Sequence, residues 1–210
     1  MAGRLFITFE GGEGTGKTTQ LAKLAAALEK KGVDVLCTRE PGGSPEAEAI
    51  RDELVSGDSG KWSPLAEALL MNAARDSHLR KTIRPALALG RTVLCDRFLD
   101  STRAYQGAAG GVDIKLIAAL EKSVVGQTVP DLTLIFDLDP DIGLARAKPS
   151  EDRFERKGAE FHSRLNAAFR EIARGEPERC RIIDASAPPD VVFAAIMKIV
   201  LPLMGSGHER

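Results

Sequence analysis

The sequence predicts an α/β fold, with a five-stranded parallel sheet covered by helices on both faces. Short apolar runs rich in β-branched residues alternate with longer amphipathic stretches along the chain, which is the order of strand–helix–strand units. The strand candidates are apolar almost throughout, as in strands that are buried on both faces. A chain of 210 residues fits one domain, 1–210, with an inserted flap.

The expected strands are short and bounded by polar or glycine-containing segments. They are residues 5–9, 33–38, 92–95, 132–136 and 180–183. The expected helices are longer stretches with apolar residues on one face. They are residues 18–31, 44–55, 65–80, 83–89, 113–125, 141–147, 160–174 and 189–203.

Local signals mark several helix ends. Gly32 and Gly90 follow helical patterns and end them. Ser44 is placed to cap a helix whose first residue is Pro45, and the same Ser-Pro pair precedes the helix at 65–80. A serine accepts from free N–H groups of the first turn, and proline has no N–H to leave unpaired there.

Residues 148–160 are strongly charged, contain both proline and glycine, and lie between two expected helices. We interpret them as a short lid; a solvated linker is the alternative. The last residues, 205–210, are glycine-rich and polar, and we expect them to be a flexible tail.

Composition excludes several classes of protein. Apolar residues make up 43% of the chain, which excludes global disorder. Lys and Arg total 29 against 30 Asp and Glu, so no basic excess favours nucleic-acid binding. The longest apolar stretch, 191–204, is too short to span a bilayer, and the N-terminal residues lack a secretory pattern. We therefore expect a cytoplasmic protein with neither nucleic acid nor membrane as a partner.

Three widely spaced cysteines, Cys37, Cys95 and Cys180, lie in apolar runs without CxxC spacing. An odd, sparse set favours reduced thiols in a reducing compartment. We interpret each as a small buried apolar residue. Metal-ligand and nucleophile roles are the alternatives.

A phosphate-binding loop is the strongest motif. Its residues, Gly11, Gly12, Glu13, Gly14, Thr15, Gly16, Lys17 and Thr18, fit GxxxxGK[ST] between an expected strand and helix. The glycines let backbone N–H groups turn toward phosphate oxygens. Lys17 is expected to reach the β and γ phosphates of ATP, and Thr18 to bind Mg²⁺. A glycine-rich turn without a ligand is the alternative.

The loop alone leaves several kinase and ATPase families open. A GTPase would need a guanine-reading Asn-Lys-x-Asp motif, which the chain lacks. A small P-loop chain with a charged flap favours a nucleoside or nucleotide kinase.

Further residues carry a resemblance to a known family. They are Arg39-Glu40-Pro41-Gly42-Gly43, Ile50-Arg51, Ala73-Ala74-Arg75, Asp96-Arg97, Ser101 to Gly107, and Asp152-Arg153-Phe154-Glu155. With the phosphate loop they recur in the order found in bacterial thymidylate kinases, which the chain resembles over about residues 4–203. The resemblance implies a nucleoside-monophosphate-kinase-like fold, and transfer of the ATP γ-phosphoryl group to dTMP in dTTP biosynthesis for DNA replication.

The same resemblance implies a homodimer through helices near 65–89 and 113–125. Two rivals stay open. One is a kinase of another nucleotide or of a deoxynucleoside, and the other is a P-loop module that binds ATP for regulation.

Asp96 and Arg97 follow the expected strand at 92–95. They are therefore expected at the carboxyl edge of the sheet, where open parallel sheets bind ligands. Asp96 can hold the water shell of Mg²⁺. Arg97 can bind the acceptor phosphate in a bidentate way, and a structural ion pair is its alternative. The resemblance makes Arg97 catalytic and Arg51 a second phosphate ligand; taken alone, Arg51 would be a solvated arginine.

The base-reading residues begin with Arg75, which lies on an otherwise apolar helix face and needs an acceptor. The resemblance implies thymine O4. Gln106 can pair with N3–H and the neighbouring carbonyl edge, because an amide both donates and accepts. Met71 stands where the family usually has a stacking Phe.

The remaining residues that the resemblance assigns to dTMP contact the base or the sugar. Tyr105 is expected to pack on the deoxyribose and to crowd out a 2′-hydroxyl, with a core aromatic as its alternative, and Glu13 to contact the 3′-hydroxyl or its water. Ser101 and Thr102 are expected to complete the base pocket, and Glu40 belongs to the same set.

The lid is expected to supply the last catalytic cation. Gly14 and Thr15 place no cation inside the phosphate loop. The resemblance assigns that part to Arg153, so we expect the lid-arginine type of enzyme. Lys148, Arg156 and Lys157 are further cations of the lid, and Arg146 is expected to cover the adenine or reach the phosphates.

Overall fold

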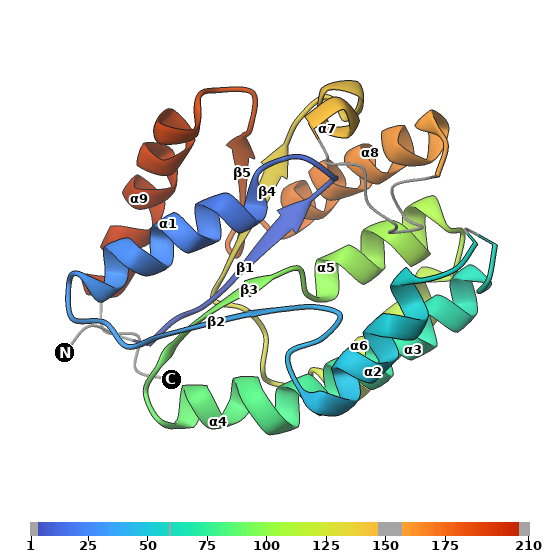
Figure 1. Ribbon diagram of the computed structural model, residues 1–210, viewed down its shortest axis with the longest axis horizontal. Coiled ribbons are helices and arrows are strands. Elements are labelled where there is room, and N and C mark those ends of the chain that lie inside the picture. The colour runs from blue at the N-terminus through green and yellow to red at the C-terminus, as the bar shows by residue number, and fades with distance from the viewer. Residues whose placement is uncertain (1–3, 59, 147–156, 206–210) are drawn as a thin grey trace.

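The computed structural model describes residues 4–58, 60–146 and 157–205. Five parallel strands form one sheet in the order β2-β3-β1-β4-β5, and the predicted fold class is confirmed (Figure 1). The strands are β1 Phe6–Gly11, β2 Val35–Arg39, β3 Thr92–Asp96, β4 Leu132–Asp137 and β5 Cys180–Asp184. Because all five strands are parallel, their carboxyl ends meet at one edge of the sheet.

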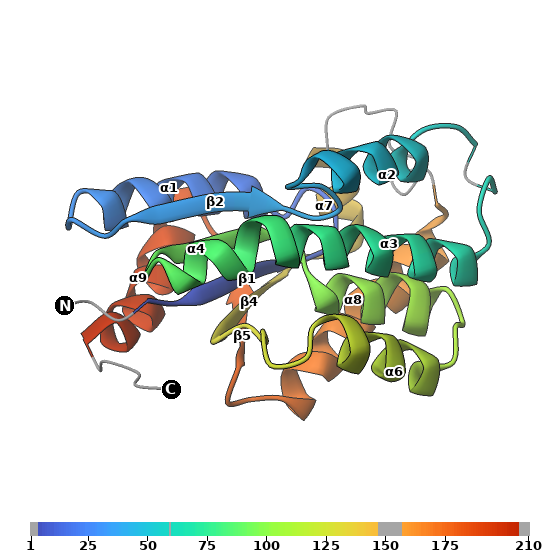
Figure 2. The same ribbon diagram turned by 90° about the horizontal axis from the view of Figure 1, so that it is seen from below.

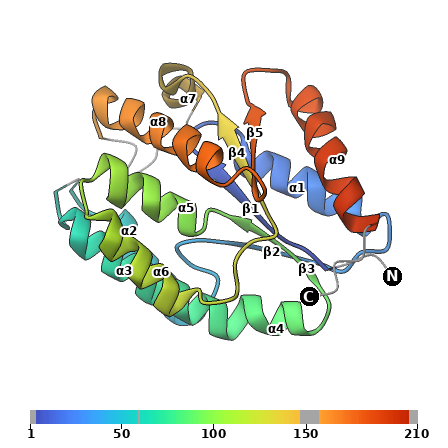
Figure 3. The same ribbon diagram turned by 180° about the vertical axis from the view of Figure 1, so that it is seen from behind.

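Helices cover both faces of the sheet. They are α1 Lys17–Glu29, α2 Pro45–Val55, α3 Pro64–His78, α4 Arg84–Ala88, α5 Leu99–Thr102, α6 Ile114–Val124, α7 Pro140–Arg146, α8 Ala159–Gly175 and α9 Pro189–Gly205. Helices α1 and α9 lie side by side on one face, and α4, α5 and α8 lie on the other (Figures 1 and 3).

The two faces of the central strand β1 differ in chemistry. Ile7 and Phe9 point into the apolar core under α1 and α9. Thr8 and Glu10 point to the opposite face and are fully buried. The Thr8 hydroxyl is 2.8 Å from the Thr133 hydroxyl of β4. The sheet therefore has a polar layer beneath α5, and this layer positions part of the site.

One long helical rod replaces two of the predicted helices, 65–80 and 83–89. Helix α3 continues through a π-helical segment, Leu79–Ile83, into α4 (Figure 2). Pro85 lies in the first turn of α4 and lacks an N–H for the preceding turn. The wider π turn accommodates that loss without ending the rod.

The segment from Leu99 to Ala109 is helical, and the sequence pattern did not predict it. It comprises α5 and a second π-helical segment, Arg103–Ala109. Its buried residues include Asp100, Thr102 and Gln106. Their partners, such as Arg179 for Asp100, lie far away in the sequence, so apolar periodicity does not reveal the helix.

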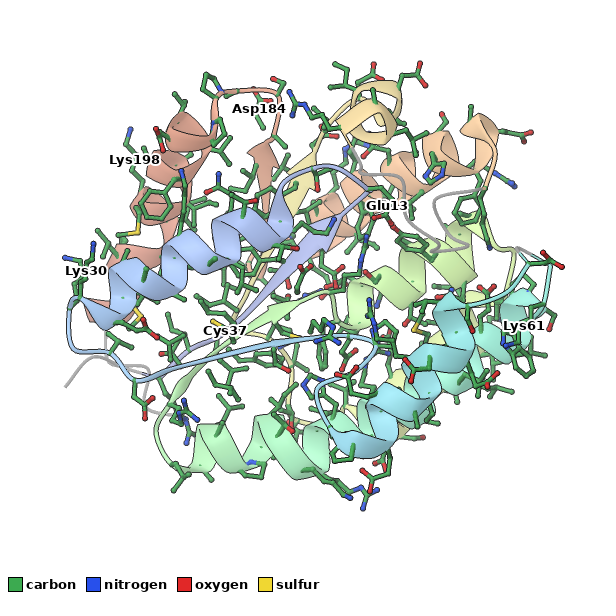
Figure 4. The ribbon with its side chains drawn as sticks, viewed as in Figure 1. Glu13, Lys30, Cys37, Lys61, Asp184 and Lys198 are labelled. Carbon is green, nitrogen blue, oxygen red and sulfur yellow. The ribbon has the colours of Figure 1, made fainter. Side chains whose placement is uncertain are left out.

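Other predictions have mixed outcomes. Cys95 and Cys180 are buried as predicted, but Cys37 is exposed, because it lies on β2, the strand at the edge of the sheet (Figure 4). The predicted lid ends earlier than 160, since α8 begins at Ala159. Most of the lid, including Lys148, Arg153 and Arg156, and tail residues 206–210 lie outside the described residues. Within the described part, no helix is long and apolar enough to cross a membrane.

Candidate active site

A cleft of 640 Å³ opens at the carboxyl edge of the sheet. All ten residues predicted to bind dTMP line it, together with Asp96, Arg146 and the phosphate-loop residues 13–18. These residues come from the β1–α1 loop, the β2–α2 turn, α2, α3, the end of β3, α7, and the helical segment Leu99 to Ala109, which is called the α5 rod below. Glu13 lies on the β1–α1 loop, at the end of the sheet where this cleft opens (Figure 4).

The phosphate loop needs a glycine at position 11, because the backbone of β4 passes close to it. At Gly11, with φ of 132°, a Cβ would lie 2.5 Å from the Phe136 carbonyl oxygen. Lys17 begins α1, and its ammonium donates to the Gly11 carbonyl at 3.1 Å and the Gly12 carbonyl at 2.5 Å. The loop therefore curls around the Lys17 ammonium.

Burial sets the electrostatics of Lys17. Burial and the neighbouring Arg97 guanidinium lower the pKa of Lys17 to about 8, against the opposing effect of the Glu13 carboxylate. A desolvated ammonium held in a glycine loop interacts strongly with any phosphate that enters.

The side-chain oxygens of Thr18 and Asp96, the two residues predicted to hold Mg²⁺, lie next to each other. The Thr18 hydroxyl donates to Asp96 Oδ2 at 2.5 Å across the gap between α1 and β3. Hard oxygen donors of this kind suit Mg²⁺. The described residues contain no cluster of three or more metal-ligating His, Cys, Asp or Glu side chains.

Arg97 has a constrained backbone and lies between the phosphate loop and α5. Its φ of 67° lies in the left-handed region, where a non-glycine residue is strained. The guanidinium donates to the Gly11 carbonyl at 3.0 Å and to Glu13 Oε1 at 2.8 Å. The Tyr105 hydroxyl donates to the same carboxylate oxygen at 2.6 Å.

These contacts keep the Glu13 carboxylate charged. Burial alone would raise its pKa, but Arg97, Lys17 and the hydrogen bond from Tyr105 lower it to about 2. Burial opposes the charge on Arg97 as well, yet the Glu13, Tyr105 and Asp96 side chains raise the pKa of Arg97 above its usual value. The structural ion pair considered for Arg97 thus exists within the cleft itself.

Arg75 has its acceptors inside the protein. It is 1% exposed and donates to Glu40 Oε2 at 2.8 Å, and to the Phe98 carbonyl and the Thr102 hydroxyl at 3.0 Å. Glu40 Oε1 lies 3.0 Å from His78 Nδ1. Burial of Arg75 therefore does not by itself demand a substrate acceptor, but these bonds hold its guanidinium rigidly at the cleft wall.

The other predicted residues approach the cleft from several directions. Arg51 donates to the Pro41 carbonyl at 2.8 Å, beside the turn after β2. Met71 is partly buried against the core under α8. Arg146, at the end of α7, donates to the Ala185 carbonyl at 3.1 Å.

Phe98 and Glu10 are among the residues near the site that the sequence did not predict. Phe98 lines the cleft, and its ring centroid lies 5.2 Å from the Arg75 guanidinium carbon. Glu10 is buried beneath the turn after β3, where it accepts from the Phe98 N–H at 2.8 Å and the Ser101 hydroxyl at 2.6 Å. The only sequence signal for Glu10 was that it is a lone charged residue in an apolar strand.

Comparison with known proteins assigns the family. The family described as thymidylate kinase matches residues 9–196. The chain belongs to the thymidylate kinase family. The predicted kinase activity, in which ATP phosphorylates dTMP to dTDP, is thereby confirmed. The roles predicted for single residues of the cleft stay predictions.

Individual thymidylate kinases resemble the chain over nearly its whole length. The thymidylate kinase of Caulobacter vibrioides is 58% identical over 95% of this chain and 97% of its own. That of Rhodopseudomonas palustris strain TIE-1 is 54% identical over 93% of this chain and 87% of its own. The crystal structure of thymidylate kinase from Ehrlichia chaffeensis superposes with a TM-score of 0.77 at 38% identity, covering 94% of this chain and 99% of that one.

Proposed function

We propose that this cleft holds ATP and dTMP together and that the γ-phosphoryl group passes directly between them, without a covalent enzyme intermediate. The observation that carries the proposal is the Arg97–Glu13–Tyr105 cluster, which joins the phosphate loop to the acceptor residues within hydrogen-bond distances. Phosphoryl transfer depends mainly on such positioning and on charge neutralisation.

On the donor side, the backbone N–H groups of the phosphate loop receive the ATP phosphates. The Lys17 ammonium then exchanges its loop carbonyl contacts for the β and γ oxygens. Thr18 and Asp96 would hold Mg²⁺, Asp96 through the water shell. When bound, the ion neutralises phosphate charge. Arg146, exposed at the end of α7, contacts the adenine or the phosphates.

On the acceptor side, Arg97 and Arg51 bind the dTMP phosphate. Arg75 contacts thymine O4, and Gln106 contacts N3–H. Tyr105 packs on the deoxyribose, and its hydroxyl together with Glu13 meets the 3′ side of the sugar. Met71, Ser101, Thr102 and Glu40 complete the pocket, with Glu40 acting through Arg75.

The lid supplies the final cation. The phosphate loop carries Gly14 and Thr15 where a loop arginine could lie, so charge that develops on the transferred group calls for a cation from elsewhere. Arg153 takes that role in this proposal, which places the chain in the lid-arginine type.

The protein acts as a cytoplasmic homodimer in this proposal. The exposed apolar side chains Leu65 and Leu69 on α3 and Ile114 and Leu116 on α6 lie on helices that contact each other. Together they form a face suited to a second copy. Sedimentation velocity decides the point: a mass of one chain would contradict the homodimer.

A substrate panel tests the proposal as a whole. Purified protein with ATP and Mg²⁺ is offered each nucleoside monophosphate and thymidine, and ADP release is followed by a coupled assay. We expect the highest kcat/KM with dTMP and no turnover of thymidine. A preference for dCMP or AMP would contradict the assigned base contacts, and turnover of thymidine would contradict the phosphate contacts of Arg51 and Arg97.

A further inference from the structure

A buried carboxylate lies directly behind the base-reading amide. Glu67 on α3 is 1% exposed, and so is Gln106. Gln106 Nε2 donates to Glu67 Oε2 at 2.9 Å. Gln106 lines the cleft, whereas Glu67 is not among the residues that line it. Glu67 is therefore placed to act on the substrate only through Gln106.

The chemistry of the pair fixes which end of the Gln106 amide faces Glu67. A carboxylate offers only acceptors, whereas the amide has an NH₂ end and a carbonyl end. The NH₂ end must therefore face Glu67. The ammonium of Lys157 lies 3.8 Å from the other carboxylate oxygen, Glu67 Oε1, so Glu67 has donors on both of its oxygens and only acceptors to offer Gln106.

The carbonyl end of Gln106 is then left for the cleft. Among the described residues, none donates a hydrogen bond to Gln106 Oε1. A pyrimidine base that meets this oxygen at N3 must bring a hydrogen. Thymine carries N3–H, whereas N3 of cytosine carries a lone pair and would repel the oxygen.

We propose that Glu67 is a specificity-determining positioning residue, which orients Gln106 so that only a base with an N3–H donor is accepted. This inference rests on the proposed contact between Gln106 and the base. Base choice then depends on a residue that does not touch the substrate.

The variant Glu67→Gln tests the inference, because it keeps the shape of the side chain and lets either end of Gln106 face it. We expect the ratio of kcat/KM for dTMP to that for dCMP to fall at least about tenfold, with the ATP KM within about twofold of its original value. Glu171→Gln on the exposed face of α8 is the matched control and should leave the ratio unchanged. An unchanged ratio in folded Glu67→Gln would overturn the inference.

Gln106→Ala separates this inference from the proposed function. If it lowers dTMP efficiency while Glu67→Gln leaves the ratio unchanged, only the role of Glu67 is wrong. If Gln106→Ala itself leaves dTMP efficiency unchanged, the proposed base contact is wrong and the inference fails with it. In the double variant, Glu67→Gln should have no further effect on the ratio.

A measurement on the unaltered protein covers the case in which Glu67→Gln does not fold. Neutron diffraction from the deuterated enzyme with dTMP locates the two deuterium atoms of the Gln106 amide. Deuterium atoms facing Glu67 support the proposed orientation. Deuterium atoms facing the base overturn it.

Discussion

Arg75 shows how much a single buried side chain can constrain a site. Its guanidinium is held by Glu40, Thr102 and the Phe98 carbonyl, so little rotamer entropy remains to be lost when a substrate arrives. Such preorganisation strengthens recognition because the ordering cost is met during folding. If Arg75 reads the base as proposed, the same burial makes it important for stability as well as for recognition.

Substitution of Arg75 by alanine should separate these two effects. We expect kcat/KM for dTMP to fall about 10²-fold or more, with a small change in the ATP KM, since the lost contacts lie on the acceptor side. The free energy of unfolding should fall by about 3–5 kcal/mol because the buried Glu40 carboxylate loses its partner. Steady-state kinetics and urea unfolding measure both. Arg80→Ala, at an exposed position, is the control, and an equal loss on the ATP side would contradict the assignment.

Lys17 is predicted to act mainly after ATP binds. Lys17→Ala should lower kcat at least about 10²-fold, because the variant loses the cation that a glycine loop holds against the phosphates. Stopped assays at saturating ATP and dTMP measure the effect. Lys30→Ala, at the far end of α1, should retain full activity. Near-normal turnover of folded Lys17→Ala would exclude the proposed role.

The α5 rod is the element that most shapes the site, and it rests on a polar layer. The buried Glu10 carboxylate of β1 accepts from the Phe98 N–H and the Ser101 hydroxyl at the start of this rod. Burial, followed by the nearby Asp100 charge, raises the pKa of Glu10 from 4.5 to about 7. The rod is thus attached to a group that titrates near neutral pH.

This shift predicts a pH-dependent stability. Because the folded pKa is the higher one, the folded state holds the proton more tightly than the unfolded chain. The resulting stability is complete below about pH 4.5 and is lost as the pH rises through 7, with a limit of about 3 kcal/mol. Urea unfolding from pH 5 to 8 should show the unaltered protein losing stability relative to Glu10→Gln. A difference that stays constant over this range would contradict the prediction.

Helix α7 approaches the phosphate loop through a glycine. A Cβ at Gly143 would lie 2.5 Å from the Glu13 carbonyl oxygen. Gly143→Ala should therefore displace the loop and raise the ATP KM about tenfold, as expected for overpacking by one methyl group. Gly175→Ala is the control, since a Cβ there would meet no atom within 4 Å. An unchanged ATP KM would show that α7 can move away freely.

At the level of the whole molecule, one sheet edge gathers residues that are almost 100 positions apart, such as Glu13 and Tyr105. The strand order places β1 between β3 and β4, so the phosphate loop and the Asp96-Arg97 turn emerge side by side. In the proposed mechanism, the remaining positive charge comes from the lid.

The lid prediction concerns Arg153. Arg153→Ala should lower kcat by about 10²–10³, less than a sole arginine finger would, because Lys148, Arg156 and Lys157 can partly replace it. KM values should change little, since the contact strengthens in the transition state. Arg164→Ala on the exposed face of α8 is the control. A large rise in KM at constant kcat would make Arg153 a ground-state ligand, and no effect would transfer the role to Arg146 or Lys148.

The amino-acid sequence was sufficient for the alternation of strands and helices, the phosphate loop and most of the residues that line the cleft, though not for Phe98. Periodicity, glycine spacing and motif order are local properties and can be read along the chain. The α5 rod, the exposure of Cys37 on an edge strand, and the contacts of Glu10 and Glu67 were decided by the tertiary structure. Each depends on a partner or a neighbouring strand far away in the sequence: a buried polar side chain is stable only where folding brings its partner within hydrogen-bond distance.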